Sequence, residues 1–186
     1  MNGRRVADSA IDGHVHKLFP NDLNANDTVF GGVIMATCDR LALVVAERHS
    51  GLVCVTASVD QIHFRAPAKR GDTLLFRAAV NRSWNTSMEI GVRVVAENSY
   101  TGAMRHIVSA YLTFVALDAN DQPANVPPVI AEGAEQCRRY EEAEVRRQAR
   151  LRVRVELQAL RGARGPRAAS PAGSSAGRER DAEPEI

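Results

Sequence analysis

The chain has few of the residues that mark most specialised classes of protein. Aromatic side chains make up only 5% of its 186 residues, too few for a platform on which nucleobases could stack. Its three cysteines, Cys38, Cys54 and Cys137, are widely spaced, so they form neither a metal motif nor a disulfide framework. No apolar run reaches membrane-spanning length, and the first residues lack the apolar stretch that a signal peptide would have. We therefore expect a cytoplasmic protein without a metal site and without a membrane partner.

A strong charge of one sign is also missing. The net charge is +2, and residues 1–130 carry twelve basic and twelve acidic residues, so the surplus lies in residues 131–186. A domain without a basic field is not expected to bind nucleic acid. The arginine-rich segment 138–154 could be read as a nucleic-acid helix, but Glu141, Glu142 and Glu144 dilute its charge. A solvated face or an oligomer contact is the favoured interpretation of this segment.

Apolar residues make up 45% of the chain, which is enough for one packed core. Composition predicts a flexible leader at residues 1–13, a folded domain at 14–128, a charged helix at 129–164 and a disordered tail at 165–186. Alternation and turn residues predict the elements of the folded domain. They are a short strand from Val15 to Phe19, a helix from Gly31 to His49 that stops at Gly51, and strands near 52–65, 73–83, 86–97 and 104–117.

The predicted helix is apolar on nearly all sides. From Val33 to Ala46, eleven of fourteen residues are apolar, and a helix of this kind is buried. One helix followed by four antiparallel strands is an α+β pattern, with a sheet wrapped around the helix. Because one sheet face cannot cover every side of a helix, we expect its far side to meet a second copy of the domain.

The start of this helix carries the most informative local chemistry. A polar loop ends in Gly31-Gly32, and Asp39 follows inside the apolar run. Free N–H groups and the positive end of the helix dipole could hold a carbonyl oxygen or an anion here. A carboxylate in such a helix loses solvation unless it is paired or placed to act. The pattern favours a hydrolytic centre. Cys38, beside Asp39, is interpreted as a small core residue and not as a nucleophile.

Several motifs together resemble one family, the cytosolic acyl-CoA hydrolases, which have the hotdog fold and include bacterial single-hotdog enzymes and animal enzymes with two fused hotdogs. The resemblance covers residues 15–128, and the charged helix that follows is similar to a segment of the animal enzymes. The motifs are Asn24-Ala25-Asn26, Phe30-Gly31-Gly32, Asp39, Val55-Thr56-Ala57-Ser58-Val59-Asp60 leading to Phe64, Gly71-Asp72 and Ser87-Met88-Glu89-Ile90.

The resemblance implies a hydrolase of fatty acyl-CoA thioesters that needs no cofactor, since CoA is part of the substrate. In this family the active site lies between two hotdogs, and the residues that match are Asn24 from one copy and Asp39 from the other. A homodimer would then hold two complete sites, and a hexamer would be a trimer of such dimers. One departure is Asp27-Thr28, where the family more often has Gly-Asp. This change concerns substrate range more than chemistry.

Each residue of this expected site has a catalytic and a structural interpretation. Gly32 N–H would polarise the thioester carbonyl, and Asp39 would act as general base or as nucleophile, two routes that the sequence does not separate. Asn24 would hold the water or the carbonyl, since an amide both donates and accepts. Alternatively, Asn24 is a turn or helix-entry residue, Asp39 is a buried carboxylate paired with a neighbour such as Arg40, and the glycines only permit close packing.

Further residues are expected to contact the substrate. Phe30 and Gly31 lie at the helix start, while basic residues should meet the phosphates of CoA. The candidates are Phe30, Gly31, Arg65, Lys69, Arg70 and Ser87. For the basic residues and Ser87, a solvated turn is an equally good interpretation.

Two other functions fit the same fold. A hotdog dehydratase or hydratase usually has a histidine near the helix start, and none occurs between His16 and His49. A non-catalytic acyl-CoA sensor or interaction module would keep the pocket but lose Asn24 or Asp39, and both are present. Acyl chain length, the choice between dimer and hexamer, the pathway and the role of the tail stay open at the level of sequence.

Overall fold

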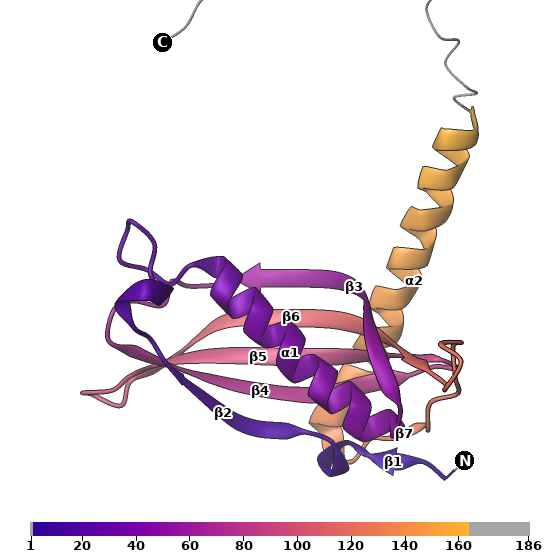
Figure 1. Ribbon diagram of the computed structural model, residues 1–186, viewed down its shortest axis with the longest axis horizontal. Helices are drawn as coiled ribbons and strands as arrows, with labels where there is room; N and C mark the ends of the chain where they lie inside the picture. The colour runs from indigo at the N-terminus through magenta and orange to yellow at the C-terminus, as the bar shows by residue number, and fades with distance from the viewer. Residues whose placement is uncertain (1, 164–186) are drawn as a thin grey trace, which may run out of the picture. The chain divides into compact units, whose positions relative to one another are not determined.

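A five-stranded antiparallel sheet curves around one helix in the computed structural model, which describes residues 2–163 (Figure 1). The strand order is β2-β4-β5-β6-β3, so that β2 and β3 are the edges. This is the α+β hotdog arrangement predicted above. The elements are β1 (Arg4–Arg5), η1 (Val6–Asp8), β2 (Ile11–Lys17), η2 (Pro20–Asp22), α1 (Gly31–Ser50), β3 (Val53–Phe64), β4 (Asp72–Ser83), β5 (Ser87–Asn98), β6 (Met104–Leu117), β7 (Val129–Ile130) and α2 (Gly133–Ala163).

Helix α1 begins and ends close to the predicted residues. Gly51 follows it with φ 74°, the left-handed conformation that glycine adopts without strain, and its N–H bonds to Glu47 O at 2.8 Å. Arg4 donates to the carbonyl oxygens of Arg48 and His49, and so satisfies two free acceptors of the last turn. The side of α1 that meets the sheet is fully apolar near its middle, with Ile34, Cys38, Ala42, Val45 and Ala46 buried.

The core lies between α1 and the concave face of the sheet. Alternate residues of the central strands point into it, as the two-residue period of a strand requires. Phe76 of β4, Ile90 of β5 and Phe114 of β6 are completely buried there. The opposite face of the same strands carries polar residues. Asn81, Glu89 and Thr113 are buried on that side, although none is apolar.

The first residues differ from the predicted loose leader and short strand. β1 pairs in parallel with β7, Val6 is buried, and β2 runs over Ile11–Lys17 where Val15 to Phe19 was expected. The predicted strand overlaps β2 at residues 15–17, and its bounds were misplaced because β2 is an edge strand with little apolar alternation. Strand β1 was missed because its partner lies far along the chain. The predicted division into leader, domain, helix and tail as such stays a prediction, and the tail, 165–186, lies outside the described residues.

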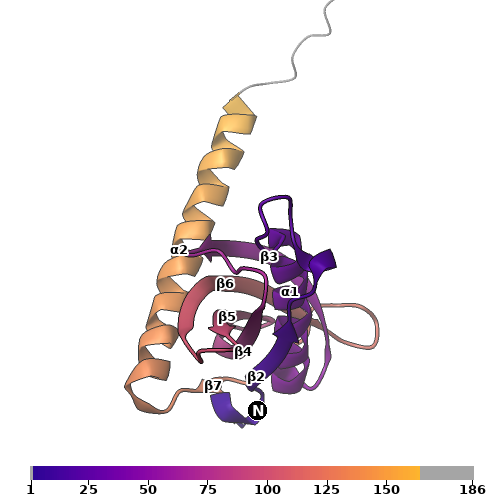
Figure 2. The same cartoon turned by 90° about the vertical axis from the view of Figure 1, so that its left-hand side faces the viewer.

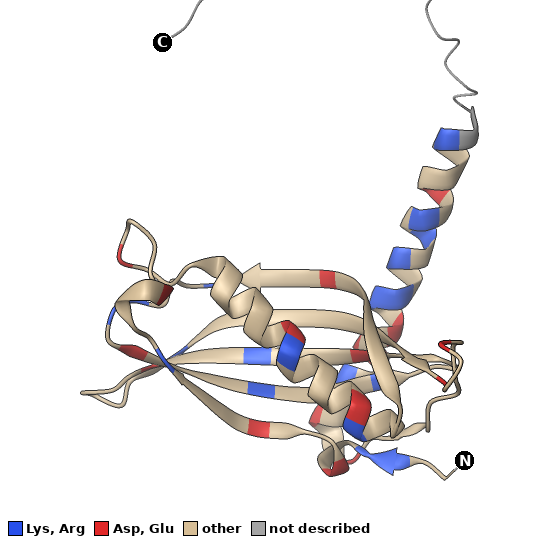
Figure 3. Cartoon of the chain, viewed as in Figure 1, with Lys and Arg blue, Asp and Glu red and all other residues tan. Residues whose placement is uncertain are grey.

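Helix α2 packs on the sheet face opposite to α1 over residues 133–150, which belong to the compact unit Met1–Arg150 (Figure 2). The helix continues from Leu151 to Ala163. Charged residues are sparse in the strands and dense along α2 (Figure 3). Within the part of the chain that the structure describes, no helix has the length and apolar character needed to cross a membrane.

Candidate active site

The loop before α1 is built around Asn24. Its backbone N–H bonds to Thr28 O at 2.8 Å, and its side-chain oxygen accepts from Asn26 N at 2.9 Å and from Thr28 Oγ1 at 3.1 Å. A bridge between Leu23 and Val29 closes the loop. Asn24 is nevertheless exposed. It therefore has the turn role that sequence allowed as the alternative, and it can be reached from outside this chain.

The unusual Asp27-Thr28 pair fits this loop. Asp27 has φ 52°, a backbone conformation for which glycine is the better residue, and its carboxylate pairs with Arg70 at 2.7 Å. Thr28 supplies both a side-chain partner to Asn24 and a backbone bridge to Lys69. The predicted residues Lys69 and Arg70 thus lie beside Asn24.

Two phenylalanine rings surround the helix start. A Cβ added at Gly32 would lie 2.4 Å from Cε1 of Phe30, and one added at Gly31 would lie 3.4 Å from Cζ of Phe64. Both rings are more than half exposed. Among the described residues, the N–H of Gly32 has no backbone acceptor, whereas Val33 N bonds to Phe30 O at 3.0 Å. The site therefore combines a free donor at the positive end of α1 with an apolar rim.

Asp39 lies two turns further along α1 and is half-buried. Thr56 of edge strand β3 donates its hydroxyl to Asp39 Oδ1 at 2.8 Å. No ion pair joins Asp39 to Arg40 within residues 2–163, so the neighbour that contacts this carboxylate is Thr56 and not Arg40. The second carboxylate oxygen, Oδ2, has no hydrogen bond from the described residues. A carboxylate that is oriented by one hydrogen bond and open on its other oxygen can accept a proton from water or attack a carbonyl.

Thr56 is the residue that sequence reasoning missed. It stood inside the quoted motif, but a threonine in a β-branched run reads as an ordinary strand residue. Only the packing of α1 against β3 brings its hydroxyl to Asp39. Phe64, at the other end of β3, was likewise quoted but not assigned to the site.

Two of the predicted site residues, Arg65 and Ser87, lie away from Asn24 and Asp39. Arg65 lines a cavity of about 270 Å³ on the side of α2, together with Arg93, Tyr111 and Arg138. Ser87 starts β5 and alternates with buried Met88, so it shares the sheet face of Glu89, which meets α2. Within one chain, the structure brings Asn24 together with Lys69 and Arg70, and Asp39 together with Thr56. It does not bring Ser87 or Arg65 to either group.

The neighbouring thiol is unsuited to be the nucleophile. Cys38 is completely buried, and burial, with a smaller contribution from Asp39, raises the pKa of its thiol to about 12. The thiol is therefore protonated near neutral pH, and only a thiolate is an effective nucleophile. In residues 2–163, no group of three or more His, Cys, Asp or Glu side chains has the geometry of a metal site.

Comparison with known proteins defines the class of this chain. Residues 26–103 match the family model of the thioesterase superfamily. An uncharacterized acyl-CoA thioester hydrolase of Bacillus subtilis, YkhA, is 36% identical over 80% of this chain and 87% of its own length. Acyl-coenzyme A thioesterase 11 of the mouse is 38% identical over 74% of this chain, which spans only 23% of that longer protein.

Solved structures agree with these relatives. A hexameric acyl-CoA thioesterase superposes with a TM-score of 0.79 at 34% identity, covering 82% of this chain and 97% of its own. The acyl-CoA hydrolase of Staphylococcus aureus, solved with butyryl-CoA and CoA, superposes with a TM-score of 0.80 at 32% identity, covering 88% and 99%. The chain therefore belongs to the acyl-CoA thioester hydrolases of the thioesterase superfamily, as the sequence motifs indicated.

Proposed function

We propose that the protein hydrolyses fatty acyl-CoA thioesters to a free fatty acid and CoA. The observation that carries this proposal is the Asp39 carboxylate, half-buried in α1, oriented by Thr56 at 2.8 Å and two turns from the Gly32 N–H. Family membership supports the reaction class.

The proposed hydrolysis uses the N–H group of Gly32 and the carboxylate of Asp39. Gly32 N–H and the dipole of α1 polarise the thioester carbonyl. Asp39 takes a proton from water, whose oxygen bonds to the acyl carbon, and the C–S bond then breaks. The sulfur leaves with the proton as CoA thiol. In the alternative route Asp39 itself attacks the carbonyl and water cleaves the resulting anhydride.

The variants of the S. aureus enzyme support the residue assignment by their positions. Its structures include variants in which an asparagine, an aspartate and a threonine are each replaced by alanine. Those three residues are spaced along that chain as Asn24, Asp39 and Thr56 are spaced along this one. The same assignment makes Thr56 a part of the proposed site.

We propose further that the site is completed by a second copy. Asn24 and Asp39 share no hydrogen bond within one chain over residues 2–163. The edge strand β3 and the outward side of α1 expose Met35, Val55, Val59 and Phe64, each by more than 40% of the residue. An edge strand with such apolar residues is a surface for pairing. A homodimer would cover it and bring the Asn24 loop of one copy to Asp39 of the other, and a hexameric neighbour supports further assembly.

Other expectations keep the status of predictions. Lys69 and Arg70 would meet phosphates of CoA, whereas Arg65 and Ser87 could do so only from a neighbouring copy, given their place on the α2 side. The cytoplasmic location and the lack of need for a cofactor stay predictions from the sequence.

The test is thiol release from acyl-CoAs of graded chain length, with Asp39→Asn beside the wild type. We expect hydrolysis by the wild type and a loss of about a hundredfold or more in the variant, the usual range for a lost general base. Cys38→Ala is the matched control on the same helix, and it should keep the activity. A folded oligomer that binds CoA but releases no thiol at any chain length would reject the proposal in favour of a non-catalytic sensor.

A further inference from the structure

Strand β3, which carries Thr56, is irregular at two places. Its pairing with β6 shifts once between Thr56 and Ser58 and again between Val59 and Gln61. Thr56 lies opposite the core residue Phe114, but Ser58 lies opposite Thr113 of the other sheet face. β-Bulges re-aim side chains and bend a strand, and they often occur next to active sites. The residue left over at the second shift is Asp60.

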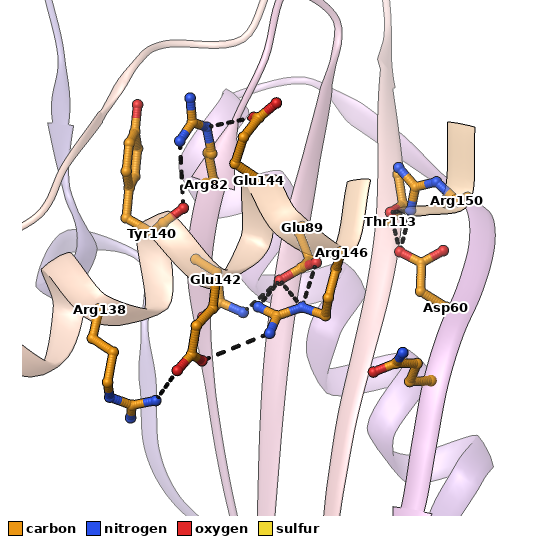
Figure 4. A network of polar contacts seen from close by, with 12 residues as sticks. Asp60, Arg82, Glu89, Thr113, Arg138, Tyr140, Glu142, Glu144, Arg146 and Arg150 are labelled. Carbon is orange, nitrogen blue, oxygen red and sulfur yellow. Dashed lines mark hydrogen bonds and ion pairs between the residues drawn. The ribbon is translucent and has the colours of Figure 1, made fainter. Parts of the chain in front are cut away.

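Asp60 is the one carboxylate of β3 (Val53–Phe64), and three side chains donate to it. Ser58 Oγ bonds to its Oδ1, Thr113 Oγ1 bonds to its Oδ2 at 2.6 Å, and Arg150 of α2 pairs with Oδ2. Arg150 also donates to Thr113 Oγ1 at 2.6 Å. The carboxylate is almost completely buried, with 6% of the Asp60 side chain exposed. Figure 4 shows Asp60, Thr113 and Arg150 converging on one point.

This cluster ties an irregular edge strand to β6 and to α2. An edge strand is paired on one side only, and each bulge removes part of its ladder. A buried carboxylate with three donors can exist in only one arrangement without leaving a charge unpaired. The cluster therefore anchors β3 at the second bulge, four residues from Thr56.

We propose that Asp60 is a positioning residue, and that Arg150 of α2 holds it so that the bulged strand aims the Thr56 hydroxyl at Asp39. This inference rests on the proposed function, because it gives the cluster its catalytic meaning. Asp60 touches neither Asp39 nor the reacting atoms, and it acts through Thr56 alone. Helix α2, outside the sheet, thus contributes to the geometry of a site on the opposite face.

A second group of polar contacts between α2 and the sheet provides the matched control. Glu144 of α2 pairs with Arg82 at 3.2 Å and accepts from Trp84 Nε1 at 2.9 Å. Arg82 lies at the end of β4 and Trp84 lies in the turn after it, away from β3. Glu144→Gln weakens the docking of the same helix without touching the bulges.

The experiment measures kcat and KM of the full-length chain for an acyl-CoA that the wild type hydrolyses. The variants are Asp60→Asn, Thr56→Val, the two combined, Arg150→Lys and Glu144→Gln, all at one protein concentration. Asp60→Asn should lower kcat by roughly tenfold or more while KM stays near the wild-type value, since misplacing one group costs rate and not binding. Glu144→Gln should leave kcat near the wild type.

The combined variant distinguishes positioning from a general structural role. If Asp60 acts through Thr56, then Asp60→Asn adds little to the loss already caused by Thr56→Val, because coupled residues are not additive. Losses that multiply in full would overturn the inference, as would equal kcat values for Asp60→Asn and Glu144→Gln.

Two further outcomes are informative. Should Asp60→Asn fail to fold, Arg150→Lys replaces it in the comparison, because lysine keeps the charge but loses the planar fork of arginine. We then expect a smaller fall in kcat in the same direction, and an unchanged kcat would reject the inference. A wild type that releases no thiol would reject the proposed function and this inference together. An active wild type whose kcat is unchanged by Asp60→Asn and Arg150→Lys would reject the inference alone.

Discussion

Glu89 and Ile90 are neighbours on β5 and are both completely buried, yet they lie in opposite environments. Ile90 points into the apolar core under α1. Glu89 points toward α2, where Arg146 contacts its carboxylate at 2.7 Å and 3.0 Å and stacks 3.8 Å over the Tyr111 ring. One sheet therefore binds one helix by apolar packing and the other by charge. The two faces should respond differently to the same kind of damage.

The largest expected effect is on the charged face. Arg146→Met leaves the Glu89 carboxylate buried without its cation, and breaking such a pair typically costs about 3–5 kcal/mol in the free energy of unfolding. The double variant Glu89→Leu/Arg146→Met removes both charges, and we expect it to be more stable than Arg146→Met alone. Denaturant unfolding at fixed protein concentration measures both. A double variant less stable than the single one would contradict this account of the α2 face.

A glycine on the same strand should show how closely this face is packed. A Cβ added at Gly91 would lie 2.7 Å from Asn81 Nδ2, the atom that donates to Glu89 Oε1 at 2.8 Å. Gly91→Ala should displace Asn81 and cost about 1–3 kcal/mol for the buried acceptor left partly unsatisfied. The combination with Asn81→Ala is the control. It should cost no more than Asn81→Ala alone, and an additive loss would show that the alanine acts elsewhere.

The apolar face should respond less to a small change. Ile90→Val removes one methylene group from the core, which typically costs about 0.5–1.5 kcal/mol. Because no charge is exposed or orphaned, the cost should be the same in low and high salt. A salt-dependent loss would indicate that the core face also depends on charge.

The smallest expected effect is on the pH dependence of stability. His49, at the end of α1, is completely buried, and its Nε2 lies 3.0 Å from Pro127 O. Burial lowers the pKa of His49 below its usual 6.5, so the unfolded chain binds a proton more readily than the folded one. Stability from this residue is therefore fully present above pH 6.5 and is lost as the pH falls toward the lowered pKa.

His49→Gln tests this contribution, because glutamine can still donate to Pro127 O but does not titrate. The midpoint of thermal unfolding should fall less between pH 7.5 and 5.5 in the variant than in the wild type. Equal slopes would assign the pH dependence to other groups.

The sequence contained much of the fold because its patterns are local. The apolar run of α1, its stop at Gly51 and the alternation in β4 and β5 all follow from neighbouring residues. Asp39 and Gly32 could be singled out for the same reason, since a carboxylate and a diglycine in a buried helix are anomalous wherever they occur. Strand β1 was missed because its pairing with β7 joins segments more than a hundred residues apart.

Tertiary structure alone decided which residues meet. Thr56 donates to Asp39, Arg150 holds Asp60, and Arg65 and Ser87 lie on the face away from Asp39. Each of these facts depends on the register of a bulged strand or on the docking of a helix, and a shift of one residue would reverse the face of a side chain. The sequence by itself determined the elements and the chemistry available on them. The fold decided which groups face each other, because that depends on packing between distant segments.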